Sequence, residues 1–287
     1  MCGCDSTNHK ILGKRLNQSQ GFNPRKKVGI TTSIAKCQNC NLIFSAILPI
    51  PNNIQDHYGI PPENYWKEDY FKLEDNYFKD EIETLKNLIT LDIKSKALDI
   101  GAGVGKCMLA LNRAGFDSYG LEPSEPFYQR AVEKMGIDIS KLKLTSIEDA
   151  KYPENEFDFI TFGAVLEHLY NPSASIEKAI KWLKPGGVIH IEVPSSKWLI
   201  NRIINFSYKI RGLDYVGNIS PMHIPYHLYE FDLKSFLLNS KLNNYNVIHH
   251  QYFVSETYLP KIFNPIIKPY MKLTNTGMQL VVWLQKK

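Results

Sequence analysis

The strongest chemical signal in the 287-residue sequence is a glycine-rich turn that follows a short apolar run. In LDIGAGVGK at 98–106, Gly101 and Gly103 allow the backbone to turn tightly and to approach a ligand closely. The helix expected from Gly105 onward directs unpaired N–H groups and the positive end of its dipole to the same point. The pattern indicates a nucleotide-cofactor site.

The residues around this turn indicate which class of cofactor the site would bind. Lys106 stands where the third glycine of the dinucleotide fingerprint G-x-G-x-x-G would be, which disfavours a dehydrogenase. The next apolar run ends at Leu121-Glu122-Pro123, so a carboxylate should lie beside the glycine turn at the carboxyl edge of a sheet. Glu122 could there accept hydrogen bonds from both hydroxyls of a ribose. The alternative is an exposed acid at a strand end.

Histidines in two segments are candidates for a general base. His168, in LEHL, follows the fourth expected strand and could equally be a packed or capping residue. His223 and His227 lie in MHIPYHLYEF, where Tyr226 and Tyr229 could orient a substrate. A histidine with a pKa of about 6.5 can take a proton from a hydroxyl that is being alkylated. We rank His227 above the other two histidines.

Four cysteines near the N-terminus have a spacing that suits a tetrahedral zinc ion. They form two pairs, Cys2-x-Cys4 and Cys37-x-x-Cys40, the second followed by Asn41, which can adopt a left-handed turn. In a cytosolic protein such a set favours metal binding over disulfides, with unligated reduced thiols as the alternative. A structural zinc ion is therefore expected in the segment 1–50.

Short apolar runs alternate with helical patterns through most of the chain, which predicts a mainly parallel sheet covered on both faces. A helix is expected at 80–91, before the sheet. Further helices are expected near 105–114, 126–135 and 173–183, and strands near 97–100, 117–121, 142–145, 158–162, 188–193, 246–254 and 278–285. The turn Lys184-Pro185-Gly186-Gly187 should separate the last of these helices from its strand.

Composition and charge narrow the class of protein. A hydrophobic fraction of 44% and a charged fraction of 22% are ordinary for a folded domain, and no apolar run approaches the ~20 residues that span a bilayer. We therefore expect a cytoplasmic protein. Residues 51–195 carry a net charge of −8 and the flanks a net charge of +13. The basic flanks are either a solvated surface or an attraction for an anionic small molecule, and no nucleic-acid-binding motif accompanies them.

These patterns divide the chain into three parts. Residues 1–50 form a small cysteine-rich appendage, 51–80 an aromatic cap or linker, and 81–287 the catalytic domain. Two inserts, at about 196–222 and 255–275, should form a lid over the site where the second substrate binds. Both are amphipathic and basic, so they could dock on the core or, less favoured, touch a membrane surface.

Four segments together resemble the successive motifs of class I S-adenosylmethionine-dependent methyltransferases, in their usual order. They are LDIGAGVG at 98–105, GLEPS at 120–124, FDFITFGAVLEHLYNP at 157–172 and LKPGGVIHIEVP at 183–194, and the similarity covers roughly residues 80–255. The resemblance implies an α/β, doubly wound, mainly parallel seven-stranded sheet. It places the methionine part of the cofactor near Asp99, Gly101, Ala102 and Gly103, the ribose on Glu122 and Pro123, and the adenine beside Ser146 and Ile147, with Gly163 also in the cofactor site. Many relatives carry an aspartate where this chain has Ser146.

The resemblance implies methyl transfer from S-adenosylmethionine, which leaves S-adenosylhomocysteine, to an oxygen or carbon of a small molecule. The knuckle-like cysteines joined to such a core resemble methyltransferases of sugar biosynthesis, which favours a sugar, a nucleotide-sugar or another specialised metabolite as acceptor. A quinone or lipid methyltransferase is the main enzymatic alternative, and a cofactor-binding module without catalysis is the other. The sequence leaves the acceptor, the base and the oligomeric state open.

Overall fold

The computed structural model describes residues 4, 6–15, 32–47, 66–92, 95–221, 227–255, 257 and 259–287. Its centre is a seven-stranded sheet in the order β10-β11-β8-β7-β4-β5-β6. The strands are β4 (Lys96–Ile100), β5 (Asp117–Glu122), β6 (Leu142–Leu144), β7 (Phe157–Gly163), β8 (Leu183–Pro194), β10 (Tyr245–Phe253) and β11 (Gln279–Lys286).

The pairing of the strands follows the doubly wound pattern. β4 pairs in parallel with both β5 and β7, and β6 and β8 extend the sheet in parallel on either side. β11 and β10 complete it as antiparallel strands. In β4, Ala97 and Leu98 are fully buried, because helices cover both faces of the sheet there. The predicted seven-stranded, mainly parallel sheet is confirmed.

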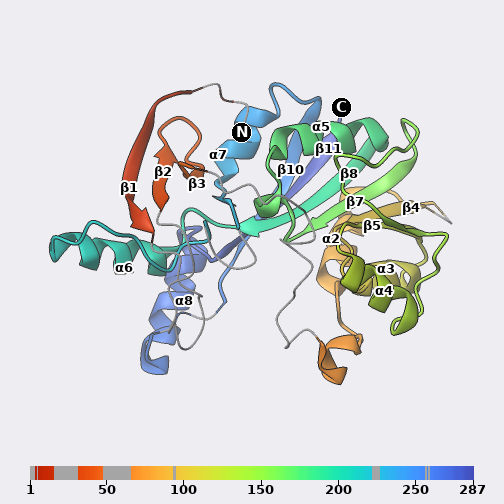
Figure 1. The fold of residues 1–287 in the computed structure, drawn as a ribbon, viewed down its shortest axis with the longest axis horizontal. Coiled ribbons are helices and arrows are strands. Elements are labelled where there is room, and N and C mark those ends of the chain that lie inside the picture. Colours follow the sequence, from red (N-terminus) through yellow and green to blue (C-terminus); the bar gives the residue numbers. More distant parts are fainter. Residues whose placement is uncertain are drawn as a thin grey trace.

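Helices lie on both faces of this sheet (Figure 1). One face is covered by α2 (Lys79–Leu88), α3 (Lys106–Arg113) and α4 (Glu125–Glu133), and the other by α5 (Pro172–Trp182) and α7 (Leu233–Asn239). On the first face, Leu85 and Leu111 pack in one cluster with Phe159 and Trp283 of the sheet. α5 begins where the Asn171 side chain accepts a hydrogen bond from the N–H of Ala174, a common helix start.

The start of β8 differs from the predicted turn. Residues 184–187 belong to β8, which begins at Leu183 rather than near 188. The register against β7 shifts there, because Phe157 pairs with Leu183 while Phe159 pairs with Val188. The extra residues bulge out of the ladder, as Pro185 and two glycines allow.

A second sheet, which the sequence did not predict, contains the N-terminal segment. It has the order β1-β2-β3-β9, with β1 (His9–Arg15), β2 (Thr32–Cys37), β3 (Ile43–Ser45) and β9 (Tyr229–Glu230), all paired antiparallel. Because β9 comes from the C-terminal half of the chain, backbone hydrogen bonds join the cysteine-rich appendage to residues 229–230.

The two predicted inserts contain helices at the side of the molecule where β8 ends (Figure 1). They are α6 (Leu199–Ile210) and α8 (Asn264–Leu273), the latter preceded by the 3₁₀ turn η4 (Lys261–Phe263). Trp198, Ile200 and Met271 form one buried cluster that joins the two inserts. Two other 3₁₀ turns are η2 (Glu68–Phe71) and η3 (Leu166–His168). Among the described residues, every helix is too short or too polar to cross a bilayer.

Candidate cofactor and acceptor site

The glycine turn lies at the carboxyl edge of β4 and adopts a conformation that glycine favours. Gly101 has a φ of 74° and its N–H donates to the carbonyl of Leu121 at 2.8 Å. A Cβ atom added to Gly101 would lie 2.5 Å from Cγ2 of Val165, so η3 lies directly beside the turn. Gly103 has a φ of 56°, and a Cβ atom there would meet nothing within 4 Å among the residues that the structure describes. The backbone at Gly103 therefore borders open space into which a ligand could fit.

Glu122 ends β5 beside this space, as predicted. Its Oε2 accepts from the N–H of Gly103 at 2.7 Å, and its Oε1 accepts from the N–H of Ser124 at 2.7 Å. Burial raises the pKa of Glu122 to about 7, although these two hydrogen bonds act to lower it. A carboxylate oxygen can accept more than one hydrogen bond, so both oxygens can still receive hydroxyl donors. Pro123 follows and is half-buried.

Asp99 lies one strand away from Glu122 and is also buried. Burial and the negative charge of Glu122 raise the pKa of Asp99 to about 7. A cation brought beside two such carboxyl groups favours their ionised forms. The sulfonium or the ammonium group of an S-adenosylmethionine molecule would fit this environment. Ala102, between the two turn glycines, is buried.

Tyr77 lies near the site and belongs to the aromatic segment 51–80 that the sequence predicts to be a cap or linker. Burial raises the pKa of its hydroxyl, and the nearby acidic groups Cys107, Asp99 and Glu192 raise it further. Tyr70, in the same segment, has the Lys106 ammonium 4.7 Å from its ring centroid. The segment is also fixed at Trp66, whose ring lies 3.8 Å from the Arg130 guanidinium. In the sequence, a run of aromatic residues marks this segment as a possible cap. The structure describes it from residue 66 onward.

The residues expected around the adenine lie at the ends of β6 and β7. The hydroxyl of Ser146 donates to Asp149 Oδ2 at 3.0 Å and accepts from the Asp149 N–H at 3.3 Å, so it is used within its own turn. Ile147 is buried in the largest hydrophobic cluster. Gly163, the last residue of β7, is exposed. Their contacts with a cofactor stay predictions.

His168 and His227 lie together on the η3 side of the glycine turn. Their rings meet edge to face with centroids 4.5 Å apart. The Nδ1 atom of His227 lies 2.5 Å from the hydroxyl oxygen of Ser220, which orients the imidazole. The N–H of Leu228 donates to the carbonyl of Glu167 at 2.7 Å and holds the two segments together. The structure thus brings together two of the three predicted histidines.

Glu167 completes this group. Burial raises its pKa to about 8, with a further contribution from Glu192. Its Oε2 is buried without a hydrogen-bond partner among the described residues. Each of three residues, Glu167, His168 and His227, places one ligand atom within 4.8 Å of the others. The three side chains could share protons through hydrogen bonds or could bind a cation.

The remaining candidates at the acceptor side divide into two kinds. His223 and Tyr226 lie outside the described residues. Tyr229 is fully buried, and its hydroxyl donates to the carbonyl of Tyr170 at 3.1 Å. Tyr229 therefore packs in the core, and contact with an acceptor would require it to move.

Three of the predicted metal ligands lie close together. Cys4, Cys37 and Cys40 place their sulfur atoms within 4.8 Å of one another, with Cys4 Sγ 3.6 Å from Cys37 Sγ. Burial raises the pKa of Cys37, but hydrogen bonds from Cys40, Asn39 and Cys4 outweigh burial and lower it. Asn41 has the left-handed conformation predicted for it, with a φ of 63°. Cys2 lies outside the described residues.

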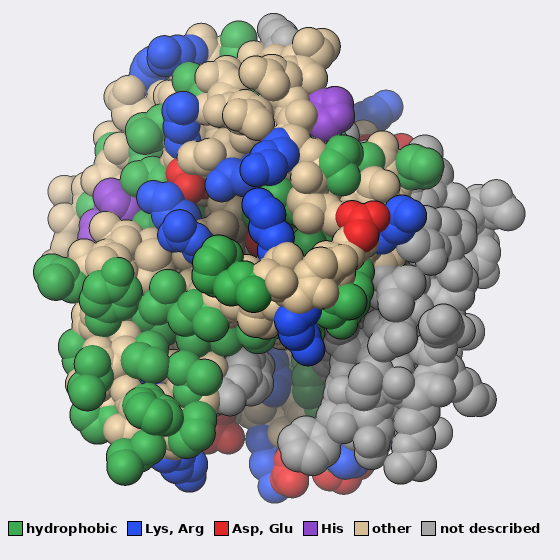
Figure 2. Space-filling model, turned by 90° about the vertical axis from the view of Figure 1, so that its left-hand side faces the viewer, with side chains coloured by type: hydrophobic (Ala, Val, Ile, Leu, Met, Phe, Trp, Pro, Cys, Tyr) green, Lys and Arg blue, Asp and Glu red, His purple; other side chains and the backbone are tan. Residues whose placement is uncertain are grey.

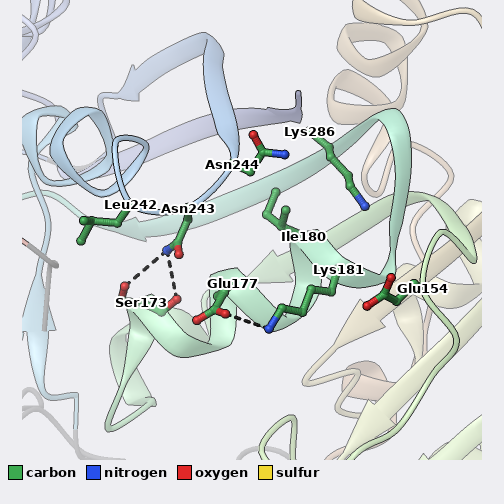
Figure 3. Close-up of a pocket in the computed structure, with 9 residues that line it drawn as sticks. All are labelled: Glu154, Ser173, Glu177, Ile180, Lys181, Leu242, Asn243, Asn244 and Lys286. Atoms are coloured by element: carbon green, nitrogen blue, oxygen red, sulfur yellow. Dashed lines mark hydrogen bonds and ion pairs between the residues drawn. The ribbon is translucent and has the colours of Figure 1, made fainter.

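A surface pocket of about 520 Å³ lies at the opposite edge of the sheet. Figure 3 shows the residues that line it. It is lined by residues from α5, from the loop after α7 and from the end of β11, including the Glu177–Lys181 ion pair at 2.8 Å. Lys286 donates there to the carbonyl of Leu183, where β8 begins. Ligands of doubly wound sheets bind at the carboxyl ends of the strands, so this pocket is separate from the candidate site.

Comparisons with known proteins agree with this geometry. Residues 72–264 match a family model described as a methyltransferase domain. The chain is 35% identical over 141 residues to the uncharacterized protein MJ1123 of Methanocaldococcus jannaschii, covering 49% of this chain and 61% of that protein. It is 27% identical over 139 residues to a ubiquinone biosynthesis O-methyltransferase of Methylococcus capsulatus, covering 45% and 59%. The matches thus span about three fifths of these relatives' lengths.

Solved structures share the fold. A SAM-dependent methyltransferase from Archaeoglobus fulgidus superposes with a TM-score of 0.53 at 17% identity, covering 78% of this chain and all of that one. A SAM-dependent methyltransferase from Methanosarcina mazei gives a TM-score of 0.50 at 17% identity, covering 71% and 96%. At these identities the likeness concerns the fold alone. Because the family model covers most of the sheet and the glycine turn, the chain belongs to the methyltransferase domain family and has the class I S-adenosylmethionine-dependent methyltransferase fold.

Proposed function

We propose that the protein transfers a methyl group from S-adenosylmethionine to an oxygen of a small-molecule acceptor. The observation that carries this proposal is the space over Gly103 that the described residues leave open, bordered by the carboxylate of Glu122. Val165, which precedes η3, lies against Gly101 beside it. A ribose held on Glu122 would place the rest of the cofactor along the glycine turn, toward the histidines.

Different residues of the chain would bind the acceptor, take its proton and orient the base. Bound S-adenosylmethionine supplies an electrophilic methyl group, so the protein must mainly hold the acceptor in line with it. His227, oriented by Ser220, takes the proton from the acceptor hydroxyl. His168 packs against the His227 ring and limits its movement. Tyr77 interacts electrostatically with Asp99, and the Tyr70 ring lies beside the Lys106 ammonium, so the aromatic segment borders this part of the site.

Replacement of His227 tests the role of the base. His227→Ala should lower kcat by about 10²-fold or more, the usual contribution of a positioned base. The Kd of S-adenosylhomocysteine, measured by calorimetry, should change little. His249→Ala, which removes an imidazole from β10, is the matched control. Equal losses in turnover and in cofactor affinity would show that His227 is structural.

The class of acceptor is the next question. Several relatives bear the name ubiquinone biosynthesis O-methyltransferase, which supports a hydroxylated aromatic ring carried on a lipid. The sugar or nucleotide-sugar acceptor expected from the sequence rests on the cysteine cluster and the basic flanks. Incubation with a methyl-labelled donor and either a lipid-soluble catechol or a nucleotide-sugar, followed by mass spectrometry, separates the two. Donor binding without a methylated product from any extract would favour a binding module instead.

We also propose that Cys4, Cys37 and Cys40 bind a structural zinc ion, with Cys2 as the predicted fourth ligand. The three sulfur atoms converge, and the N–H of Cys40 points to Cys37 Sγ at 3.5 Å, a contact that stabilises a thiolate.

Metal analysis tests the zinc proposal. The purified protein should contain about one zinc per chain, and a chelator should lower the melting temperature by several degrees. Cys37→Ser should lose the metal, whereas Cys107→Ser, on α3, should retain it. Metal-free protein with an unchanged melting temperature would leave the cysteines as reduced thiols.

A further inference from the structure

Two helices of the inserts expose apolar side chains to solvent along one stripe each. On α6 these are Ile203, Phe206 and Ile210, with exposed fractions of 49%, 65% and 70%. Their spacing of three and four residues places them on one side of the helix. On η4 and α8 the exposed set is larger and contains Ile262, Phe263, Ile266, Tyr270 and Leu273.

The opposite sides of the same helices already pack against the protein. Ile200 and Ile204 of α6, and Ile267 and Met271 of α8, belong to one apolar cluster with Trp198. The N–H of Leu199 donates to the carbonyl of Thr276 at 3.1 Å and fixes the two inserts together. The expected docking on the core therefore uses one face of each helix. The exposed stripes lie outside this packed cluster, so they are apolar surface that does not contribute to it.

The charged residues along these two helices are basic, although the exposed Asp214 lies just beyond α6 and Figure 2 shows acidic side chains on the same face. Residues 197–213 and 259–275 contain seven Lys and Arg residues and no Asp or Glu. Lys209 of α6 and Lys272 of α8 are exposed among the apolar side chains. Figure 2 shows the apolar side chains gathered on one face, with a band of Lys and Arg side chains beside them. Contiguous apolar patches of this kind mark interaction sites rather than ordinary surface.

We propose that α6 and α8 form a docking surface for an anionic phospholipid bilayer. Helices with an apolar stripe and flanking Lys and Arg lie in the interface of such membranes, where acyl chains cover the stripe and headgroups meet the cations. A second copy of the chain is a poorer partner, because it would bring a second basic surface against the first. The inference is independent of the proposed methyl transfer.

The location of the surface gives docking a consequence for the acceptor. α6 follows the carboxyl end of β8, at the edge of the sheet where β4 and β5 also end. A bilayer bound to α6 and α8 would lie beside the acceptor side of the site. If methyl transfer is established, an amphiphilic acceptor could then reach His227 without crossing open water.

Vesicle flotation tests the proposal without any methyl donor. The protein should bind vesicles of phosphatidylcholine containing about one third phosphatidylglycerol at least about tenfold more tightly than vesicles of pure phosphatidylcholine. Combined Phe206→Ser, Ile210→Ser, Ile266→Ser and Leu273→Ser should reduce that binding by about tenfold or more. Lys209→Glu with Lys272→Glu should reduce it while leaving the apolar stripe intact.

A matched control removes apolar side chains that are equally exposed but lie elsewhere. Ile139→Ser with Leu242→Ser should leave vesicle binding unchanged. Calorimetry with S-adenosylhomocysteine on each variant separates loss of docking from loss of the cofactor site. Equal vesicle binding by the stripe variant and the original protein would overturn the proposal. So would a dimer, seen by sedimentation, that the stripe variant dissociates.

Discussion

Glu122 is engaged on both carboxylate oxygens by the backbone amides of Gly103 and Ser124. The acid and the glycine turn therefore position each other, and the side chain is ordered without a ligand. Order of this kind lowers the conformational entropy that binding would otherwise cost. It also ties the carboxylate charge to the geometry of the turn, because protonation weakens the bond to the amide.

The titration of Glu122 predicts how affinity for the cofactor product depends on pH. Its pKa of about 7 lies above the usual value, and ribose hydroxyls donate best to the ionised form. Affinity for S-adenosylhomocysteine should therefore rise as the pH increases from 6 to 8, by up to about tenfold. Calorimetry across this range measures the slope. Glu122→Gln should bind more weakly and with a flatter profile, the remaining slope coming from Asp99. If the pH dependence of affinity were unchanged in that variant, titration of Glu122 would not be its cause.

At the scale of elements, Gly101 lies against Val165, the residue before the 3₁₀ turn η3 that carries His168. Gly101→Ala would place a methyl group 2.5 Å from Val165 and force a positive φ on alanine. We expect it to lower the free energy of unfolding by about 2–4 kcal/mol, measured by urea denaturation. The double variant Gly101→Ala, Val165→Ala should recover part of that loss.

Gly103→Ala is the comparison for this prediction. Its added Cβ meets open space, so only the backbone strain of about 1–2 kcal/mol remains. Its larger effect should be on binding of the cofactor. If the Gly101→Ala and Gly103→Ala variants had the same free energy of unfolding, the contact between residue 101 and Val165 would not contribute to stability.

The elements that could be predicted are those whose signals are local. The alternation of apolar runs and helical patterns placed each strand of the seven-stranded sheet within a few residues, and the glycine turn with Glu122 followed from adjacent motifs. The four-stranded sheet was missed because β3 has three residues and β9 has two, and their pairing joins positions about 190 residues apart. The interaction of Tyr77 with Asp99 was not predicted, because a run of aromatic residues does not show which of them lies near the site. The burial of the Tyr229 ring was not predicted, because neither charge nor spacing reveals it, and its contact with an acceptor stays a prediction.

For the whole molecule, buried ionisable groups predict an optimum of stability in mildly acidic solution. Asp99, Glu122, Glu167 and Glu230 have pKa values raised to about 7 or 8, so the folded protein takes up protons as the pH falls from 8 toward 6 and is stabilised. His190 has the opposite effect: burial lowers its pKa to about 3, so below about pH 6.5 only the unfolded chain gains that proton. Because the four carboxyl groups outnumber this one imidazole, urea denaturation should show the free energy of unfolding rising as the pH falls from 8 to about 5, by roughly a few kcal/mol between pH 8 and 6. A steady decline from pH 8 downward would contradict this assignment.

The short strand β9 has a consequence for the order of events during synthesis. β3 leaves the ribosome early, but its partner residues 229 and 230 emerge only after the five parallel strands β4 to β8 of the larger sheet have been translated. Domains commonly fold as their residues emerge, so the N-terminal strands must wait, with one edge uncovered, until late in translation. A nascent chain stalled before residue 229 should therefore lack the completed four-stranded sheet, and the segment that carries His227 would be added in the same late step.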